Sequence, residues 1–119
     1  MKYDKNNVFH KIIHGELRAK TVLDGEHFMA FHDIAPKAPV HVLIIPKGNY
    51  VDYNDFSEHA SDAEILDFNR AISKVVRMMR LENGFKMISN AGKFGMPGDE
   101  RGQEVMHMHV HILGKPSDE

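Results

Sequence analysis

One stretch determines how this chain is interpreted: Gly102-Gln103-Glu104-Val105-Met106-His107-Met108-His109-Val110-His111-Ile112-Leu113-Gly114. Its period-2 alternation predicts an extended strand with one buried face. The apolar members are expected to face the core, namely Met106, Met108, Val110 and Ile112. The histidines at 107, 109 and 111 would then line the opposite face, each about 7 Å from the next. Three imidazoles on one rigid element form a row of groups that titrate near neutral pH.

Two chemistries explain such a row better than a chance cluster among the nine histidines of the chain. Neutral imidazole is a common ligand of zinc and similar ions. One imidazole can also act as a nucleophile while its neighbours bind or transfer protons. Metal sites usually add a carboxylate or a cysteine from outside the strand, and the sequence pattern indicates no such additional ligand. The local pattern therefore favours catalysis and leaves metal binding open.

Composition narrows the function classes. The chain has 119 residues, which predicts one domain with a single core. A net charge of −2 and the lack of a basic run argue against nucleic-acid binding. No apolar stretch approaches the roughly 18 residues that span a bilayer, and the N-terminal residues lead into no apolar signal region. With no cysteine, disulfides and thiolate chemistry are excluded, and we expect a cytoplasmic protein.

The first half of the chain predicts a helix, a hairpin and a buried strand. Asn6 or Asn7 can cap a short helix whose apolar face carries Val8, Phe9, Ile12 and Ile13. A turn at Asp24-Gly25 joins two apolar runs over 21–23 and 27–31, as in a hairpin. Two prolines make 31–39 an ordered loop. The run 40–46 predicts a strand buried in part on both faces, in which His41 alone would more often be a satisfied core group.

The second half predicts a loop, one long helix and two strands. Residues 47–60 are expected to form a loop. Ser61 and Glu64 have the capping-box form, and apolar residues at helical spacing follow until Asn83-Gly84. A strand over 85–89 and a glycine-containing loop over 90–102 precede the histidine strand. The predicted fold is α+β, an antiparallel sheet of about five strands with one short and one long helix packed on one side.

Two long motifs resemble the histidine triad (HIT) superfamily. The histidine strand has that family's form His-φ-His-φ-His-φ-φ, where φ is apolar. The segment Phe31-His32-Asp33-Ile34-Ala35-Pro36-Lys37-Ala38-Pro39-Val40-His41-Val42-Leu43-Ile44-Ile45-Pro46-Lys47 resembles the matching segment of the HINT branch, the nucleoside phosphoramidate hydrolases. Phe9-His10-Lys11-Ile12-Ile13 and Asn90-Ala91-Gly92 also match in order and spacing. The resemblance covers residues 7–114 and implies one HIT domain over 1–119.

The resemblance implies catalytic roles for four histidines. His109 matches the nucleophile that attacks the α-phosphorus and forms a covalent nucleotidyl-histidine. His107 and His111 match its flanking partners, and His41 matches the fourth active-site histidine. In the family a backbone carbonyl holds the nucleophile's other ring nitrogen, and neutral imidazole is a good nucleophile near pH 7 because its pKa is about 6.5. The family needs no metal and no cofactor for this reaction.

The resemblance also implies a nucleotide-binding set. Asp33 matches the carboxylate that hydrogen-bonds the ribose hydroxyls, and Asn90 matches a residue near phosphate and ribose. The base pocket is matched by Phe9, Ile12, Phe31 and Ile34, and the surroundings of the α-phosphate and leaving group by Gln103, Glu104 and Val105. The implied substrate is a purine nucleoside 5′-phosphoramidate or an aminoacyl-adenylate, which is hydrolysed to AMP or GMP. The implied assembly is a homodimer.

Three alternatives stay open, and three departures bear on substrate choice. A dinucleoside polyphosphate hydrolase has the same triad, and a nucleotide-binding regulatory protein could hydrolyse only incidentally. A metal-binding module is the last alternative. The loop over 93–101 looks longer than the family's usual connection. Glu104 stands where many members carry a small hydroxyl residue. The tail after Gly114 lacks the tryptophan that some members use to complete the neighbouring subunit's site.

Overall fold

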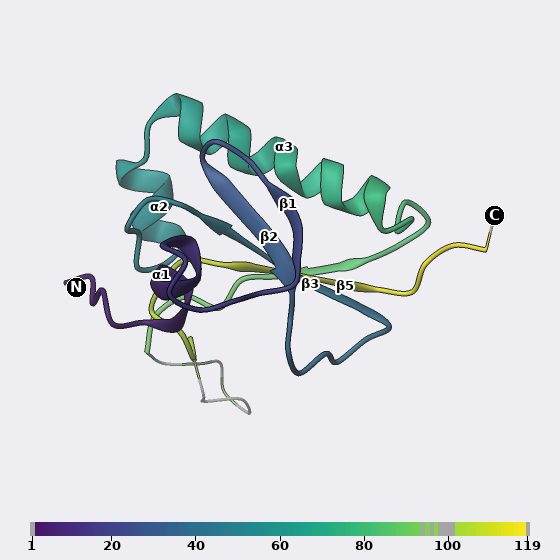
Figure 1. Ribbon diagram of the computed structural model, residues 1–119, viewed down its shortest axis with the longest axis horizontal. Helices are drawn as coiled ribbons and strands as arrows, with labels where there is room; N and C mark the ends of the chain where they lie inside the picture. Colours follow the sequence, from purple (N-terminus) through teal and green to yellow (C-terminus); the bar gives the residue numbers. More distant parts are fainter. Residues whose placement is uncertain (1, 94, 96, 98–101, 119) are drawn as a thin grey trace.

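The fold is a five-stranded antiparallel sheet with three helices. The computed structural model describes residues 2–93, 95, 97 and 102–118. Its elements follow in the order α1 (Val8–Ile13), β1 (Thr21–Asp24), β2 (Phe28–His32), β3 (Val40–Pro46), α2 (Tyr53–His59), α3 (Asp62–Met78), β4 (Lys86–Ile88) and β5 (Val110–Gly114). The strands lie in the order β1-β2-β3-β5-β4 (Figure 1). Every neighbouring pair is antiparallel, which confirms the α+β class and the five-stranded sheet.

β3 lies at the centre of the sheet, and all of its residues are buried. Its side chains alternate between two apolar clusters because successive strand residues point to opposite faces. Val42 and Ile44 pack with residues of α2 and α3, such as Phe56 and Val75. Leu43 and Ile45 pack with Phe9 of α1 and with Phe31 of β2. The helices therefore cover both faces of the sheet, and the expectation that they pack on one side is wrong.

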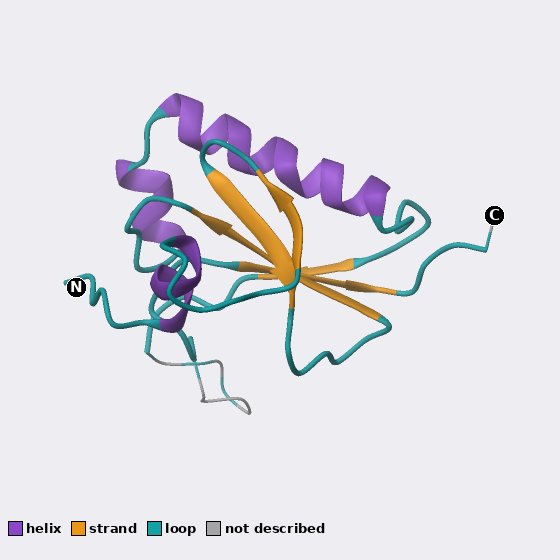
Figure 2. Ribbon diagram, viewed as in Figure 1, coloured by secondary structure: helices purple, strands orange, loops and turns teal. Residues whose placement is uncertain are grey.

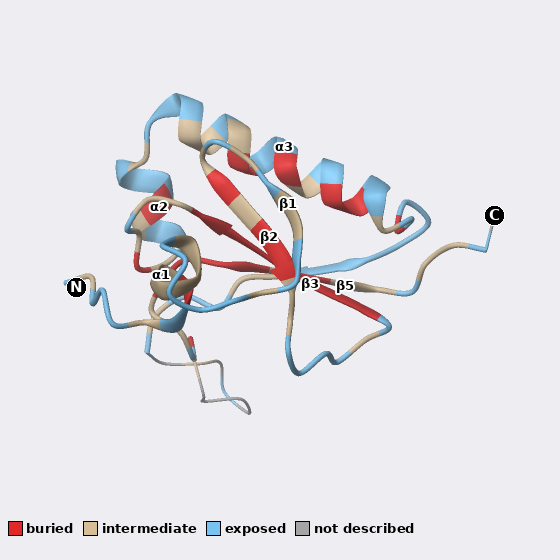
Figure 3. Cartoon of the chain, viewed as in Figure 1, coloured by how far each residue is buried: buried red, intermediate tan, exposed pale blue. Residues whose placement is uncertain are grey.

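The helix starts are those that the sequence predicts, whereas the end of the long helix is not. Asn7 accepts from the His10 backbone N–H and caps α1. Ser61 and Glu64 form the full capping box at the start of α3, whose buried residues face the strands (Figure 3). The helix ends at Met78, several residues before Gly84, and the chain turns at Arg80 with φ 58°. Within the described residues, no helix is both long and apolar enough to cross a membrane.

The segment 47–60, expected to be a loop, contains the helix α2, which leads directly into α3 (Figure 2). Asp52 caps it by accepting from the Asp55 backbone N–H. Only Phe56 of this helix is buried. A single buried residue leaves no periodic apolar pattern, so the usual sequence signal of a helix is missing.

The histidine strand is shorter than its alternation predicts. β5 spans only Val110–Gly114, and the chain bends between Glu104 and His107. Met108, Val110 and Ile112 lie in the core as expected, whereas Met106 is only half-buried and lies outside the buried clusters. Of the loop 93–101, only Lys93, Gly95 and Pro97 are among the described residues, so its length relative to the family stays a prediction.

Candidate active site

A cavity of about 930 Å³ lies between α1, the loop after β2, and the segments that flank β5. Its wall is formed by residues from the whole length of the chain, which only the folded sheet brings together. The cavity is lined by eleven of the residues expected at the site: Phe9, Ile12, Phe31, Asp33, Ile34, His41, Asn90, Glu104, Val105, His109 and His111. Ile34 is 98% exposed and stands at the rim, whereas Phe9 and Phe31 are buried in the wall. His107 and Gln103 do not line the cavity.

His109 is held in one tautomer by the backbone. Its Nδ1 lies 2.8 Å from the His107 carbonyl oxygen, which can only accept, so Nδ1 carries the proton. Nε2 is then the nitrogen with the free lone pair. Ser89 Oγ donates to the His109 carbonyl at 2.7 Å and fixes the main chain there. Burial lowers the pKa of His109, so the ring stays neutral near pH 7.

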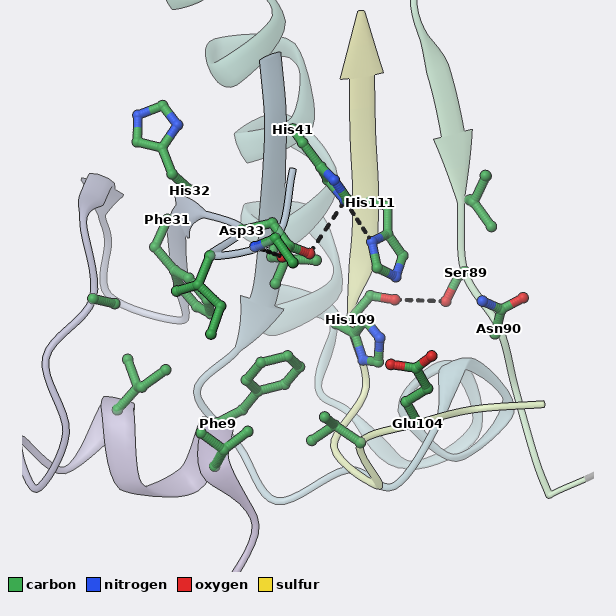
Figure 4. Close-up of a pocket in the computed structure, with 18 of the residues that line it drawn as sticks. Phe9, Phe31, His32, Asp33, His41, Ser89, Asn90, Glu104, His109 and His111 are labelled. Carbon is green, nitrogen blue, oxygen red and sulfur yellow. Dashed lines mark hydrogen bonds and ion pairs between the residues drawn. The ribbon is translucent and has the colours of Figure 1, made fainter. Parts of the chain in front are cut away.

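The surroundings of the His109 ring are apolar on one side and polar on the other (Figure 4). The Phe9 ring meets it edge-on at a centroid distance of 5.0 Å. The His111 ring lies at 5.0 Å along the same segment of chain. The Glu104 carboxylate is directed toward it and acts to raise the pKa of His109, although burial outweighs this effect. The nitrogen with the free lone pair, Nε2, thus belongs to a buried ring at the wall of a cavity.

His41, His111 and Asp33 form a hydrogen-bonded group beside His109. The Lys37 backbone N–H donates to His41 Nδ1 at 3.1 Å, so the His41 proton is on Nε2. That nitrogen lies 2.9 Å from His111 Nδ1 and 3.3 Å from Asp33 Oδ2. His111 Nδ1 therefore accepts, and Nε2 of His111 carries a proton that it can donate. Burial and the neighbouring His109 lower the pKa of His111 to about 4, so it donates as a neutral ring.

His107 and Gln103 lie behind the cavity wall. His107 is fully buried, and its Nε2 donates to the Pro46 carbonyl at 2.8 Å. Burial lowers the pKa of His107 to about 4. Gln103 accepts from the Gly92 backbone N–H at 3.0 Å. The Gln103 amide also donates to the carbonyls of Val51 and Val105, so its side chain bonds to the main chain at three places among the described residues.

Comparison with known proteins identifies the family of this chain. A family model described as the HIT domain matches residues 14–118. The chain belongs to the HIT family. A HIT-like protein of Azospirillum brasilense is 48% identical over 112 residues, which cover 93% of this chain and 87% of that protein.

Solved structures of the HIT family have the same fold. A HIT family hydrolase from Clostridium thermocellum is 33% identical with a TM-score of 0.75, covering 98% of this chain and 96% of that one. A HIT family hydrolase from Legionella pneumophila is 34% identical with a TM-score of 0.75, covering 94% of this chain and 95% of that one.

One cluster in this HIT domain has the spacing of a metal site. Asp33, His41 and His111 each offer a ligand atom, and these atoms lie within 4.8 Å of one another. A metal at His41 Nε2 would displace the proton to Nδ1, because a neutral ligand imidazole keeps one proton. Nδ1 already accepts from the Lys37 N–H, and two donors would then face each other. The proton positions thus favour a hydrogen-bonded network over metal ligation.

Sequence reasoning missed three residues that shape the site. Lys37 acts through its backbone N–H, and such a contact has no signal in residue type. Ser89 directly follows β4, and a hydroxyl side chain is common at the exposed end of a strand. Tyr3 contacts His107 from a position that precedes the residues matched by the HIT family model. All three were detectable only once the main-chain path was known.

Proposed function

We propose that this protein is a nucleotide hydrolase that cleaves the P–N bond of purine nucleoside 5′-phosphoramidates through a nucleotidyl-histidine on His109. The observation that carries the proposal is the bond from His109 Nδ1–H to the His107 carbonyl, which leaves Nε2 as the nucleophilic nitrogen in the cavity wall. The relatives named as HIT family hydrolases support hydrolysis as the reaction class.

The nucleotide would fit the cavity with its base at the apolar end. Phe9, Phe31, Ile12 and Ile34 would hold the base, since all four line the cavity around α1 and the loop after β2. Asp33 would accept from the ribose hydroxyls. Its Oδ1 already accepts from the Ala35 N–H at 2.8 Å, but a carboxylate has about four acceptor sites, so two hydroxyls can still be bound. Asn90 would reach the phosphate and ribose from the opposite wall.

The reaction would proceed in two steps. His109 Nε2 bonds to the α-phosphorus as the P–N bond to the leaving group breaks, and the leaving nitrogen takes up a proton from solvent near the exposed Glu104. Water then attacks the phosphorus and releases a proton to solvent as the bond to Nε2 breaks, and a nucleoside monophosphate is released. His111 would donate from Nε2–H to a phosphoryl oxygen in both steps, with His41 behind it fixing that tautomer.

His107 and Gln103, which lie behind the cavity wall, would act through the main chain. His107 supplies the carbonyl that holds His109, and Gln103 fixes Val105 and Gly92, which flank the region expected around the α-phosphate. Their roles are therefore proposed as positioning, whereas Glu104 and Val105 line the cavity directly.

The test combines turnover with capture of the intermediate. Protein treated with a chelator is mixed with adenosine 5′-phosphoramidate, AMP release is followed by chromatography, and the adduct is mapped by mass spectrometry at neutral pH. We expect an adenylyl group on His109 and at least about a 10³-fold loss of turnover in His109→Ala. His59→Ala is the matched control, because His59 lies on the exposed side of α2, away from the cavity.

Other outcomes would refute or redirect the proposal. Full turnover in His109→Ala, or an adduct on another residue, would refute the assigned nucleophile. Faster cleavage of diadenosine tetraphosphate than of the phosphoramidate would favour the dinucleoside polyphosphate hydrolase. Tight AMP binding without turnover would favour the regulatory binding protein.

We also propose that the protein forms a homodimer through β4, an edge strand of the sheet. Phe85 and Met87 beside or within this strand are 43% and 56% exposed. An apolar, unpaired edge is a surface that a second copy can cover. Light scattering should give twice the monomer mass, and Met87→Glu should shift the protein toward monomer.

The cytoplasmic location expected from the cysteine-free sequence stays a prediction.

A further inference from the structure

Tyr3, near the start of the chain, contacts the first histidine of the triad. Its hydroxyl oxygen lies 2.5 Å from His107 Nδ1 and 3.3 Å from His10 Nδ1. The rings of Tyr3 and His107 meet edge-on with centroids 5.5 Å apart. The segment that carries Tyr3 therefore adds a polar contact to a buried histidine more than a hundred residues away in the sequence.

The direction of this hydrogen bond follows from the other side of the His107 ring. Nε2 lies 2.8 Å from the Pro46 carbonyl oxygen and must carry the proton, so Nδ1 is an acceptor. The Tyr3 hydroxyl is thus the donor to Nδ1. Burial raises the pKa of Tyr3, which keeps the phenol protonated and able to donate. The phenol oxygen can in turn accept from Nδ1–H of His10.

His107 connects this contact to the nucleophile. Its side chain is bonded at both nitrogens, to Tyr3 and to Pro46, and its own carbonyl accepts from His109 Nδ1–H at 2.8 Å. A ring fixed at both ends restricts rotation of the residue and therefore of its carbonyl. We propose that Tyr3 is a positioning residue for His109: it fixes His107, and the His107 carbonyl holds His109 in the tautomer whose Nε2 is free. The expected effect of Tyr3 on the reaction rate rests on the proposed nucleotidyl transfer, whereas its effect on the His109 tautomer is independent of that function.

The first test measures the tautomers directly. Protein with ¹⁵N-labelled histidine is studied by long-range ¹H–¹⁵N NMR, which distinguishes protonated, hydrogen-bonded and free ring nitrogens. In the wild type we expect His107 with Nε2–H and a hydrogen-bonded Nδ1, and His109 with Nδ1–H. In Tyr3→Phe, which removes only the hydroxyl, the His107 Nδ1 signal should move to that of a free acceptor, and His109 should become a mixture of tautomers.

Tyr50→Phe is the matched control. Its hydroxyl also donates one hydrogen bond, at 2.8 Å to Glu64 Oε2, but Glu64 belongs to the start of α3 and not to the triad. This variant should leave the signals of both histidines unchanged. Unchanged His107 and His109 signals in folded Tyr3→Phe protein would overturn the proposal, whatever the enzyme's activity.

The second test measures the chemical step. In single-turnover experiments with adenosine 5′-phosphoramidate, Tyr3→Phe should slow formation of the adduct about 3- to 10-fold, the effect expected from one hydrogen bond. The Kd for AMP should stay the same, because Tyr3 does not line the cavity. Equal losses in binding and rate would indicate general disruption and refute a positioning role. If the wild type forms no adduct, the proposed function fails, and the NMR measurement alone decides whether Tyr3 fixes His109.

Discussion

Replacing His107 by glutamine should make the protein less sensitive to acid. His107 is fully buried, and its pKa is lowered from 6.5 to about 4, chiefly by burial. Between these two values the unfolded chain takes up a proton that the folded protein does not. The contribution of a neutral His107 to the free energy of unfolding is thus fully present above 6.5 and is lost as the pH falls toward about 4.

The size of this effect follows from the two pKa values. The difference between 6.5 and about 4, at about 1.4 kcal/mol for each unit of pKa, corresponds to about 3 kcal/mol in total. About 2 kcal/mol of it should already be lost by about pH 5, where the native state is still measurable. Glutamine does not titrate, and its amide can donate to the Pro46 carbonyl in place of Nε2. The variant therefore lacks this acid-dependent loss, although it starts from a lower stability.

Urea unfolding followed by far-UV circular dichroism at about pH 7.5 and about pH 5 measures the difference. Both proteins must be at one concentration, because dimer formation would add to the apparent stability. Wild type should lose about 2 kcal/mol more than His107→Gln between the two conditions. His59→Gln is the control, since the hydrogen bond to Asp55 raises the pKa of His59 and its replacement should not reduce acid sensitivity. Parallel losses in wild type and His107→Gln would refute a buried neutral His107.

Three further substitutions test the site and the fold. His109→Ala should stay folded but lose about 1–3 kcal/mol in urea unfolding, because its ring is 5% exposed and packs on Phe9. Asp33→Ala should raise KM far more for ribonucleotides than for 2′,3′-dideoxy analogues; equal increases would rule out its ribose role. Ser61→Ala removes the cap on the Glu64 N–H and should lower the free energy of unfolding by about 1 kcal/mol without changing kcat/KM.

The parts of the fold that the sequence predicts are those with a local physical cause. Asn7 and Ser61 cap their helices because a side-chain oxygen beside a helix start can accept from its free N–H groups. The same local argument fails at the end of α3. Glycine at 84 is suited to a left-handed conformation, but Arg80 takes it instead. The chain turns early because Leu81 is buried against the sheet, and that tertiary contact outweighs the local preference.

The histidine segment shows where a periodic pattern stops being informative. From Met108 onward, alternate residues enter the core, as the pattern predicts. N-terminal to Met108, the bend at residues 104–107 interrupts the alternation of buried and exposed side chains. His107 is therefore buried in the interior, whereas His109 and His111 line the cavity. The sequence pattern predicts three equivalent imidazoles on one face, but in the structure His107 is separated from the other two.

Main-chain atoms set the tautomers of three of the four histidines, and the His41 ring then sets that of His111. The Pro46 carbonyl fixes His107, the His107 carbonyl fixes His109, and the Lys37 N–H fixes His41. An acceptor at one ring nitrogen makes the other a nucleophile, and a donor at one makes the other a proton source. Because every backbone unit offers the same two groups, residue types cannot reveal which imidazole receives which. A protein with the same four histidines on a different main-chain path would therefore lack a defined nucleophile, even with its motif intact.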